Sequence, residues 1–473
     1  MKLSFQHDIP SFSGNFIIPV FETGPNHLVP IEFYGVSVPS KVFYGKANEI
    51  YAIEKYDNVH LFIGLGKTPD YKSVVTMFRR AAHKYPEFFN KAVLIDLPNG
   101  LEPQLVSALV SGLKLGTYKI GHFKNEKPHP ITNSDFALTI NNYKSEEAFL
   151  QKALILADAQ LQCMQWVDLP PNVVTPEYMA KAGTDLANET QFQATVLDKN
   201  ALQELGMGAL LAVGQGSKND ARLLVLELNP EAEGKHYALV GKGVTFDTGG
   251  LNIKTAGMQF MKSDMAGAAA VVATMHYLAK SDSKKRVTAV VPLCENAVDA
   301  ASLKPSAVIE AFNKKTIEII DTDAEGRLIL ADALAYLIAK HKPDVIVDIA
   351  TLTGSSVATF GYECGALFTN NVDLEFALRS AGNQVGEKLW PLPLWSAYDP
   401  DISSDIADVR NYSGKPIAGA ITAAKFLEYF TDKHEAWAHL DIAGVAFGDS
   451  EFAKFKHATA FGVNLLSTFI ENH

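Results

Sequence analysis

Cysteine is scarce in this sequence, and the few cysteines lack the spacing of two common kinds of site. Only three occur in 473 residues: Cys163, Cys294 and Cys364. No two of them have the Cys-x-x-Cys spacing of a zinc–thiolate site, and three cysteines cannot all pair in disulfides. We therefore expect neither a disulfide framework nor a zinc–thiolate site, and the composition fits a reducing compartment.

Long apolar runs and an excess of positive charge are also missing. The longest candidate for a membrane span, Gly267–Ala279, is shorter than the roughly 20 residues that cross a bilayer. Residues 1–10 contain no apolar core of signal-peptide length. A net charge of −11 argues against a general nucleic-acid or anionic-membrane surface, although a local basic patch stays open. We expect a cytoplasmic protein with neither a membrane nor nucleic acid as its main partner.

Several catalytic and nucleotide-binding motifs are absent or incomplete. The chain has no His-Glu-x-x-His zinc-protease helix and no Gly-x-Ser-x-Gly nucleophile elbow. Gly64–Thr68 is similar to the end of a phosphate-binding P-loop, but the position that requires glycine is Leu61. His276 lies in an apolar, helix-like run and His439 in a strand-like run, so we expect structural roles for both.

Apolar runs alternate with helical patterns along the chain, in a composition of 47% hydrophobic and 20% charged residues that is typical of soluble globular proteins. Predicted strands cover residues 59–66, 91–97, 193–197, 221–227, 237–246, 286–293, 317–320 and 344–349. Predicted helices cover residues 73–85, 105–115, 145–166, 178–188, 200–205, 267–279 and 328–340. This alternation predicts an α/β fold, with mixed or largely parallel sheets flanked by helices.

Two glycine-containing stretches, Val240–Lys254 and Asp321–Leu328, hold an unusual density of charged groups. With Met261–Met265 they contain five carboxylates, three lysines and one arginine. Both stretches follow apolar runs, and open α/β sheets bind ligands at strand ends. Carboxylates sharing one pocket repel each other unless a cation lies between them. Solvated turn charges explain any single residue, but the joint pattern indicates a carboxylate-rich metal site with an open number of metals.

The octapeptide Asp321–Leu328 resembles the signature of the leucyl aminopeptidases, the cytosol aminopeptidase (M17) family. That signature usually begins with Asn, where this chain has Asp321. The likeness extends to residues 169–176, 241–250, 261–265, 348–354, 414–420 and 437–444. It spans about residues 165 to 473, and no motif before about residue 145 matches. The family resemblance implies an N-terminal α/β domain (1–145), a connecting helix (146–168) and a catalytic domain (169–473) with a two-metal site.

The resemblance also implies roles for individual residues. The metal ligands would be Lys242, Asp247, Asp264, Asp323 and Glu325. A lysine ligand must be neutral, and two nearby cations would lower its pKa. Lys254 would stabilise the oxyanion of the tetrahedral intermediate, and Arg327 would hold a bicarbonate ion that relays a proton to the leaving amine. The substrate-binding residues would be Met261, Asp264, Thr351, Leu352 and Gly354.

The function implied by the resemblance is that of a metal-dependent aminopeptidase, which removes leucine and other apolar residues from the N-termini of peptides. Two divalent ions per subunit, zinc or manganese, would activate a water molecule, and the chain would assemble as a homohexamer. Another two-metal hydrolase, such as a phosphatase, and a regulatory nucleic-acid-binding role are the alternatives. The native metal, the exact residue preference, the physiological peptides, the role of the N-terminal domain and the effect of Asp321 stay open.

Overall fold

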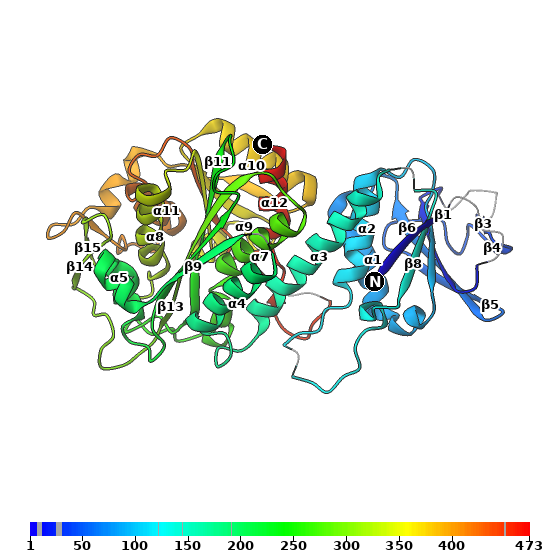
Figure 1. Ribbon diagram of the computed structural model, residues 1–473, viewed down its shortest axis with the longest axis horizontal. Coiled ribbons are helices and arrows are strands. Elements are labelled where there is room, and N and C mark those ends of the chain that lie inside the picture. Colours follow the sequence, from blue (N-terminus) through cyan, green and yellow to red (C-terminus); the bar gives the residue numbers. More distant parts are fainter. Residues whose placement is uncertain (7–11, 25–30, 122, 144, 191, 449–450) are drawn as a thin grey trace. The chain divides into compact units, whose positions relative to one another are not determined.

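The computed structural model describes residues 1–473 except 7–11, 25–30, 122, 144, 191 and 449–450 (Figure 1). Contacts divide the chain into two compact units, residues 1–158 and 159–473, and the division falls within helix α3 (Glu147–Asp168). The predicted boundaries at 145 and 168 stay a prediction. In the described part of the chain, no helix is both long and apolar enough to cross a membrane.

The N-terminal unit is built on a six-stranded sheet in which only the edge strand β5 runs antiparallel to its neighbour. In sheet order the strands are β1 (Lys2–Gln6), β8 (Ala137–Asn141), β7 (Val93–Asp96), β2 (Asn15–Phe21), β6 (Asn58–Gly66) and β5 (Ile50–Lys55). A hairpin of β3 (Ile31–Phe33) and β4 (Val36–Val38) is separate. Helices α1 (Tyr71–Lys84) and α2 (Pro103–Leu115) pack against each other, and α1 begins at a capping box of Asp70 and Ser73.

The C-terminal unit contains a nine-stranded mixed sheet whose centre, β20-β16-β11-β13, is parallel. In sheet order the strands are β18 (Leu389–Pro391), β17 (Gly365–Thr369), β20 (Trp437–Asp441), β16 (Val345–Ala350), β11 (His236–Gly241), β13 (Arg286–Asn296), β10 (Arg222–Leu228) and β9 (Gln193–Leu197). Strand β12 (Gly243–Asp247) lies beside β13. The prediction of a buried parallel strand at 344–349 is confirmed by β16, which is buried along its whole length.

Helices cover both faces of this sheet. One face carries α4 (Pro176–Glu189), α7 (Ala266–Lys280), α10 (Val372–Val385) and α12 (Val463–Asn472). The other carries α6 (Gly208–Gly214), α8 (Gly326–His341), α9 (Gly354–Phe360) and α11 (Gly419–Tyr429), while α5 (Lys199–Leu205) packs on α6 and the edge strands (Figure 1). Helices α7 and α8 are buried on nearly all sides, and the alanines and glycine in the first turns of α7 allow close packing on the parallel strands.

Two predicted strands differ from those observed. The strand expected at 237–246 is interrupted at Lys242, where β11 ends and β12 begins. The backbone N–H of Lys242 donates to Ile349 O, and its carbonyl accepts from Ala268 of α7 instead of from a strand. β12 then continues along β13 alone, with a bulge between Val244 and Phe246. A helix N-terminus therefore takes the place of a strand partner at this residue.

The strand expected at 317–320 is β15 (Thr316–Glu318), and it does not belong to the large sheet. It forms a three-stranded sheet with β14 (Val308–Glu310) and β19 (Val409–Arg410). Ile317 and Ile319 are buried in the same core cluster as the inner residues of α8. The apolar run is thus a core-facing segment of a small sheet, which leads directly into the loop before α8.

Candidate metal centre

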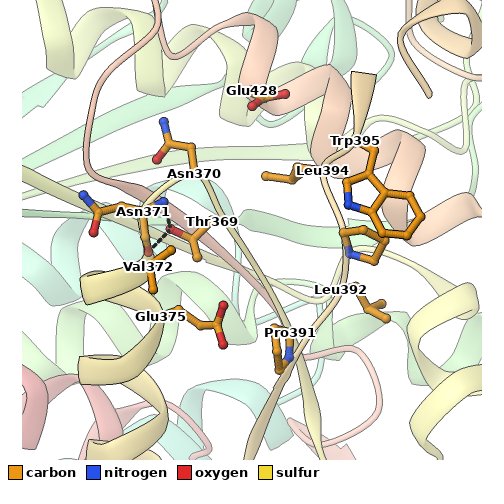
Figure 2. Close-up of a pocket in the computed structure, with 11 residues that line it drawn as sticks. Thr369, Asn370, Asn371, Val372, Glu375, Pro391, Leu392, Leu394, Trp395 and Glu428 are labelled. Atoms are coloured by element: carbon orange, nitrogen blue, oxygen red, sulfur yellow. Dashed lines mark hydrogen bonds between the residues drawn. The ribbon is translucent and has the colours of Figure 1, made fainter. Parts of the chain in front are cut away.

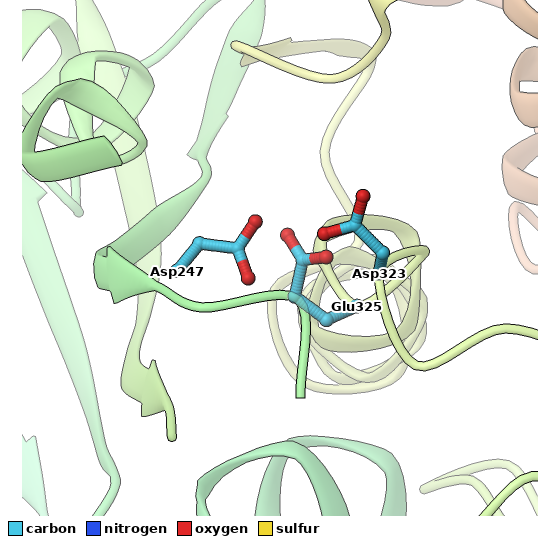
Figure 3. Close-up of side chains that lie close together, drawn as sticks. All are labelled: Asp247, Asp323 and Glu325. Carbon is cyan, nitrogen blue, oxygen red and sulfur yellow. The ribbon is translucent and has the colours of Figure 1, made fainter. Parts of the chain in front are cut away.

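Three carboxylates converge beyond the carboxyl end of β12. Asp247 ends β12, while Asp323 and Glu325 belong to the loop that leads into α8 (Figure 3). One oxygen from each of the three groups lies within 4.8 Å of the other two. Asp247 and Glu325 are buried, and Asp323 lies at the more exposed side of the cluster. The sequence-predicted stretches around 247 and 323 are therefore brought together in space.

Lys242 lies between two of the predicted ligands. Its Nζ is 2.7 Å from Asp264 Oδ2 and 2.9 Å from Glu325 Oε1, and it donates to Thr351 O at 3.0 Å. The side chain passes directly over Gly326, where a Cβ atom would lie 2.4 Å from Lys242 Cε. A residue without a side chain is therefore required at this position for Lys242 to reach the carboxylates.

Lys254 pairs with the other two carboxylates of the site, Asp247 and Asp323. Its Nζ is 2.9 Å from Asp247 Oδ2 and is also paired with Asp323. The side chain of Lys254 is 18% exposed, whereas that of Lys242 is 3% exposed. Two groups of ion pairs, Lys242 with Asp264 and Glu325 and Lys254 with Asp247 and Asp323, therefore meet at the clustered carboxylates. We call these six residues the ion-pair network; they are the five predicted metal ligands and the predicted oxyanion residue.

The acids of the network perturb the titration of the lysines and of each other. Burial disfavours the charged form of Lys242, but Asp264, Glu325 and Asp247 outweigh this and raise its pKa well above the ordinary value. Burial, together with the charges of Asp247 and Glu325, raises the pKa of Asp323 to about 7. Two bound cations would reverse the balance at Lys242, because positive charge beside an ammonium group lowers its pKa.

The network is a suitable site for cations. Its four carboxylates exceed its two ammonium groups in charge when all are ionised. Glu325 Oε2 is buried and has no hydrogen-bond partner among the described residues. A buried, unpartnered carboxylate oxygen is costly unless a proton or a metal ion neutralises it. Oxygen ligands with one amine fit hard or borderline divalent ions such as Mn²⁺ or Zn²⁺.

Arg327, in the first turn of α8, is not paired with the carboxylates of the network. It is buried, and its Nη1 donates to Asn411 O at 2.9 Å, while its Nε has no hydrogen-bond partner in the described structure. Burial lowers the pKa of Arg327 to about 10, although Glu325 and Asp321 act in the opposite direction. Arg327 is therefore charged at neutral pH, and its Nε–H is available as a hydrogen-bond donor.

Asn296, which the sequence analysis missed, links the two halves of the cluster. It ends β13 and is buried. Its Nδ2 donates to Asp247 Oδ1 at 2.8 Å and to Thr322 O at 3.0 Å. A polar residue at the carboxyl end of an apolar strand was the available signal. Hydrogen bonds of this kind fix the orientation of a carboxylate ligand.

A reciprocal pair of hydrogen bonds joins the loop after β12 to the loop before α8. Asn252 Oδ1 accepts from Thr322 N at 3.0 Å, and the Thr322 hydroxyl accepts from Asn252 N at 2.9 Å. The loop after β12 carries Lys254, so this pair holds that loop against the loop that carries Asp323. Thr322 and Asn252 lie inside the recognised stretches but were not singled out from the sequence.

The turn at residues 351–354 lies next to the cluster. Thr351 Oγ1 donates to Asp264 Oδ1 at 2.9 Å. Asp441, at the end of β20, accepts from Leu352 N at 3.1 Å and from Thr353 Oγ1 at 2.6 Å. Met261 lies in the short 3₁₀ helix η3 (Met258–Ser263), directly before Asp264. Of the other predicted substrate-binding residues, Thr351 and Met261 therefore bond to Asp264, Leu352 bonds to Asp441, and Gly354 begins α9.

Both histidines that drew attention in the sequence are buried away from the network. His439 Nδ1 is paired with Asp348 Oδ1, and Trp437 Nε1 donates to the second oxygen of Asp348. His276 lies on the buried surface of α7. Among the described residues, no histidine joins the ion-pair network. These positions fit the structural roles expected for both residues.

A separate cavity of about 500 Å³ contains none of the predicted site residues (Figure 2). Its walls come from residues 369–375, residues 391–395 and Glu428. Two amides among its lining residues already bond within the protein, since Asn370 Nδ2 donates to His434 O and Asn371 Nδ2 to Glu435 O. The cavity therefore carries no evident chemistry of its own.

Comparison with known proteins relates both the sequence and the fold to one family. The profile described as "Cytosol aminopeptidase family, catalytic domain" matches residues 162–467. A "Probable cytosol aminopeptidase" from Chlorobaculum tepidum is 42% identical over 375 residues, which cover 77% of this chain and 74% of the relative. One from Nitrobacter winogradskyi is 38% identical over 423 residues, covering 87% and 84%.

A solved structure, "Bottromycin maturation enzyme BotP in complex with Mn", has a similar fold. It superposes with a TM-score of 0.85 at 29% sequence identity, covering 97% of this chain and 99% of its own. The likeness therefore includes the N-terminal unit, which the family profile does not cover.

Proposed function

The chain belongs to the cytosol aminopeptidase family, and from this premise we propose that it is a leucyl aminopeptidase with a two-metal centre. Membership of the family makes it a metal-dependent hydrolase that acts on the N-termini of peptides. The finer proposal is that it prefers leucine and other apolar residues. The observation that carries the proposal is the convergence of Asp247, Asp323 and Glu325 beside Lys242 and Asp264.

We assign Lys242, Asp247, Asp264, Asp323 and Glu325 as ligands of two divalent ions, zinc or manganese. Asp247 and Glu325 would contribute to both ions, which is supported by their carboxylates lying within 4.8 Å of each other while each pairs with a different lysine. The complex of BotP with Mn supports a divalent ion in a fold of this kind. When bound, two such ions supply a water molecule of lowered pKa and polarise a carbonyl oxygen.

Lys254 is the group that we assign to the oxyanion of the tetrahedral intermediate. It is a cation at the edge of the network, and its exposure exceeds that of Lys242 several-fold. A substrate carbonyl oxygen can therefore reach Lys254, whereas Lys242 is enclosed by Asp264, Glu325 and Thr351 O. A positioned donor of this kind stabilises the negative charge that develops in acyl transfer.

Arg327 is assigned to holding a bicarbonate ion, which would carry the proton from the attacking water to the leaving amine. The support is that Arg327 is buried and charged at neutral pH, and that its Nε is not used by a protein acceptor in the described structure. The planar guanidinium group binds a planar oxyanion through two parallel hydrogen bonds. Arg327 would then position an acid–base group without ligating a metal.

The preference for apolar N-terminal residues is assigned to Met261 and the turn at 351–354. Burial of a leucine side chain against such a wall contributes about 0.8 kcal/mol per methylene group. Asp264, itself an assigned ligand, is held by Thr351 Oγ1 and Lys242, which connects this turn to the other ligands. In this proposal the free α-amino group of the substrate binds beside the carboxylates, and an N-acylated substrate cannot bind in this way.

We further propose a cytoplasmic homohexamer. Large apolar side chains are exposed on α10 and in the segments that follow it, which supports burial against another copy. They include Val372, Phe376, Trp390 and Trp395. Sedimentation velocity of the full chain tests the assembly, and a monomer across micromolar concentrations would contradict it.

A panel of aminoacyl p-nitroanilides tests the proposed activity. Metal-stripped protein is assayed with added Mn²⁺, Zn²⁺, Co²⁺ or Mg²⁺, and N-acetyl-leucine p-nitroanilide is the control substrate. We expect the highest kcat/KM for leucine, dependence on added metal and no hydrolysis of the acetylated substrate. Equal rates on the free and acetylated substrates would contradict the aminopeptidase assignment, and a preference for charged residues would contradict the leucyl assignment.

A further inference from the structure

Asn411 is a fully buried residue that directly follows β19 (Val409–Arg410). Its relative exposure is 0%. It carries no charge and touches none of the assigned metal ligands through a hydrogen bond. Its backbone N–H donates to Glu318 O at 3.0 Å, which extends the parallel pairing of β19 with β15 by one residue. This pairing brings Asn411 alongside the loop that begins at residue 319.

The side-chain amide of Asn411 makes hydrogen bonds to four backbone groups of that loop. Its Oδ1 accepts from Ile320 N at 2.8 Å and from Asp321 N at 3.3 Å. Its Nδ2 donates to Asp321 O at 2.6 Å and to Ala324 O at 3.3 Å. The bonded groups lie on both sides of Asp323 in the chain and directly before Glu325. One side chain therefore fixes the backbone that carries two of the clustered carboxylates.

The backbone carbonyl of the same residue fixes Arg327. Arg327 Nη1 donates to Asn411 O at 2.9 Å. Asn411 thus sets the position of the loop and of the guanidinium group relative to one another, although the two partners lie more than 80 residues away in the sequence. Asp323 is further held by the bond from its own N–H to Asp321 Oδ1 at 2.8 Å.

The chemistry of the site requires an amide at position 411. The loop presents two N–H groups and two carbonyls to a site without water access, so the side chain must accept and donate at once. An aspartate would accept but would place negative charge against Asp321 O and Ala324 O. An alanine or leucine would leave all four backbone groups without this partner, and buried groups in that state drive the loop to rearrange.

We propose that Asn411 is a positioning residue of the metal centre, which sets the spacing of Asp323 and Glu325 and the placement of Arg327. This inference rests on the proposed two-metal function of those residues. It predicts that Asn411 controls metal affinity without contacting a metal. Replacing a residue that orients metal ligands without contacting the metal typically lowers metal affinity or activity by about 10–100-fold.

The test compares Asn411→Ala with a matched control, Asn15→Ala, in the full-length chain. Asn15 is also buried, and it also clamps two backbone groups, donating to Phe88 O at 2.6 Å and accepting from Val59 N at 2.9 Å. It lies in the N-terminal unit, and none of its hydrogen-bond partners belongs to the metal centre. Both variants lose one buried amide clamp, but only Asn411→Ala loses one beside the ligand loop.

Metal affinity is measured by competition between metal-stripped protein and a chromogenic chelator for Zn²⁺ and Mn²⁺, beside the melting temperature of the metal-free protein and kcat with leucine p-nitroanilide. We expect 10–100-fold weaker binding of at least one ion and a lower kcat for Asn411→Ala. We expect native affinity for Asn15→Ala, even where its melting temperature falls. Asn411→Ser, which keeps one donor and one acceptor, provides the same comparison if Asn411→Ala does not fold.

Native metal affinity in a folded Asn411 variant would overturn the proposal, whatever its melting temperature. Equal weakening in Asn411→Ala and Asn15→Ala would also overturn it, because the effect would then follow general destabilisation. Failure of the proposed function is a different result: the native chain would bind no divalent ion or cleave no free aminoacyl substrate, irrespective of position 411.

Discussion

Gly326→Ala is a one-carbon change that tests whether the metal centre depends on the path of Lys242. Gly326 is the first residue of α8, and a Cβ atom there would lie 2.4 Å from Lys242 Cε and 2.6 Å from its Nζ. Carbon atoms in contact are normally about 3.5–4.0 Å apart. Lys242 would therefore have to move by roughly 1 Å, away from Asp264 and Glu325.

The magnitude follows from two opposing effects. Alanine is favoured over glycine within a helix by about 0.5–1 kcal/mol, which would stabilise α8. Overpacking of a closely packed site costs about 1–3 kcal/mol, so the melting temperature should change little or fall. The catalytic effect should be larger, because a misplacement of about 1 Å in a site of this kind costs about 10²-fold in rate.

The assay measures kcat/KM, metal content by mass spectrometry and the melting temperature of Gly326→Ala. The control is Gly448→Ala, where a new Cβ would have no heavy atom of the described residues within 4 Å apart from those of its chain neighbours. We expect a loss of about 10²-fold in kcat/KM for Gly326→Ala and none for the control. Native kcat/KM and a full metal complement in Gly326→Ala would refute the reasoning, because Lys242 would then not need its observed path.

Further predictions concern ligands, substrate, anion and pH. Asp323→Ala and Glu325→Ala should each have a lower metal content, measured by mass spectrometry, and a loss of kcat larger than the ~10²–10⁴-fold that one acid–base group supplies. Full metal content with normal turnover would contradict the ligand assignment. The enzyme should cleave leucyl dipeptides and leave their N-acetyl forms intact, as measured by chromatography of the products. Comparable rates on both substrates would contradict a role for the free amine. Arg327→Ala should keep both metals, lose at most ~10²–10⁴-fold in kcat and respond less than the native enzyme to added bicarbonate; loss of metal would show a different role. Burial, together with nearby basic groups, lowers the pKa of His236 from 6.5 to about 4. The unfolded chain therefore takes up this proton first, and stability is lost as pH falls from about 6.5 to about 4, by up to about 1.4 kcal/mol per pH unit. In thermal melts across this pH range, the melting temperature of His236→Gln should fall less steeply with decreasing pH than that of the native chain. Parallel plots of melting temperature against pH for the two proteins would contradict this role of His236.

Strong local periodicity made much of the fold predictable. The helix predicted at 328–340 is α8, and the apolar Val/Ile run at 344–349 is the buried strand β16, each within two residues at either end. The run at 317–320 was apolar for a different reason, because Ile317 and Ile319 face the core from a small separate sheet. Composition alone does not distinguish these cases, since both environments bury alternate or adjacent apolar side chains.

The charged residues of the candidate site could be named from the sequence, but the amides that hold them could not. Asp323 and Glu325 stand out because acids are rare beside apolar segments. Asn296 and Asn411 are common turn-type residues, and their importance depends on bonds to Thr322 O and Asp321 O across tens of residues. Such long-range hydrogen bonds leave no periodic trace in a single sequence.

The bulge in β12, between Val244 and Phe246, determines where along this strand the centre is sensitive to chain length. Side chains of a strand alternate between its two faces, and a bulge adds one residue to one strand without adding one to its partner. Asp247 lies opposite Asn296 because the bulge accommodates Thr245, so deleting Thr245 would restore a regular ladder and keep this pairing. Deleting a residue after the bulge would instead shift the register and turn Asp247 to the opposite face of the sheet, so a relative shortened there would have the assigned ligand residues without the metal centre.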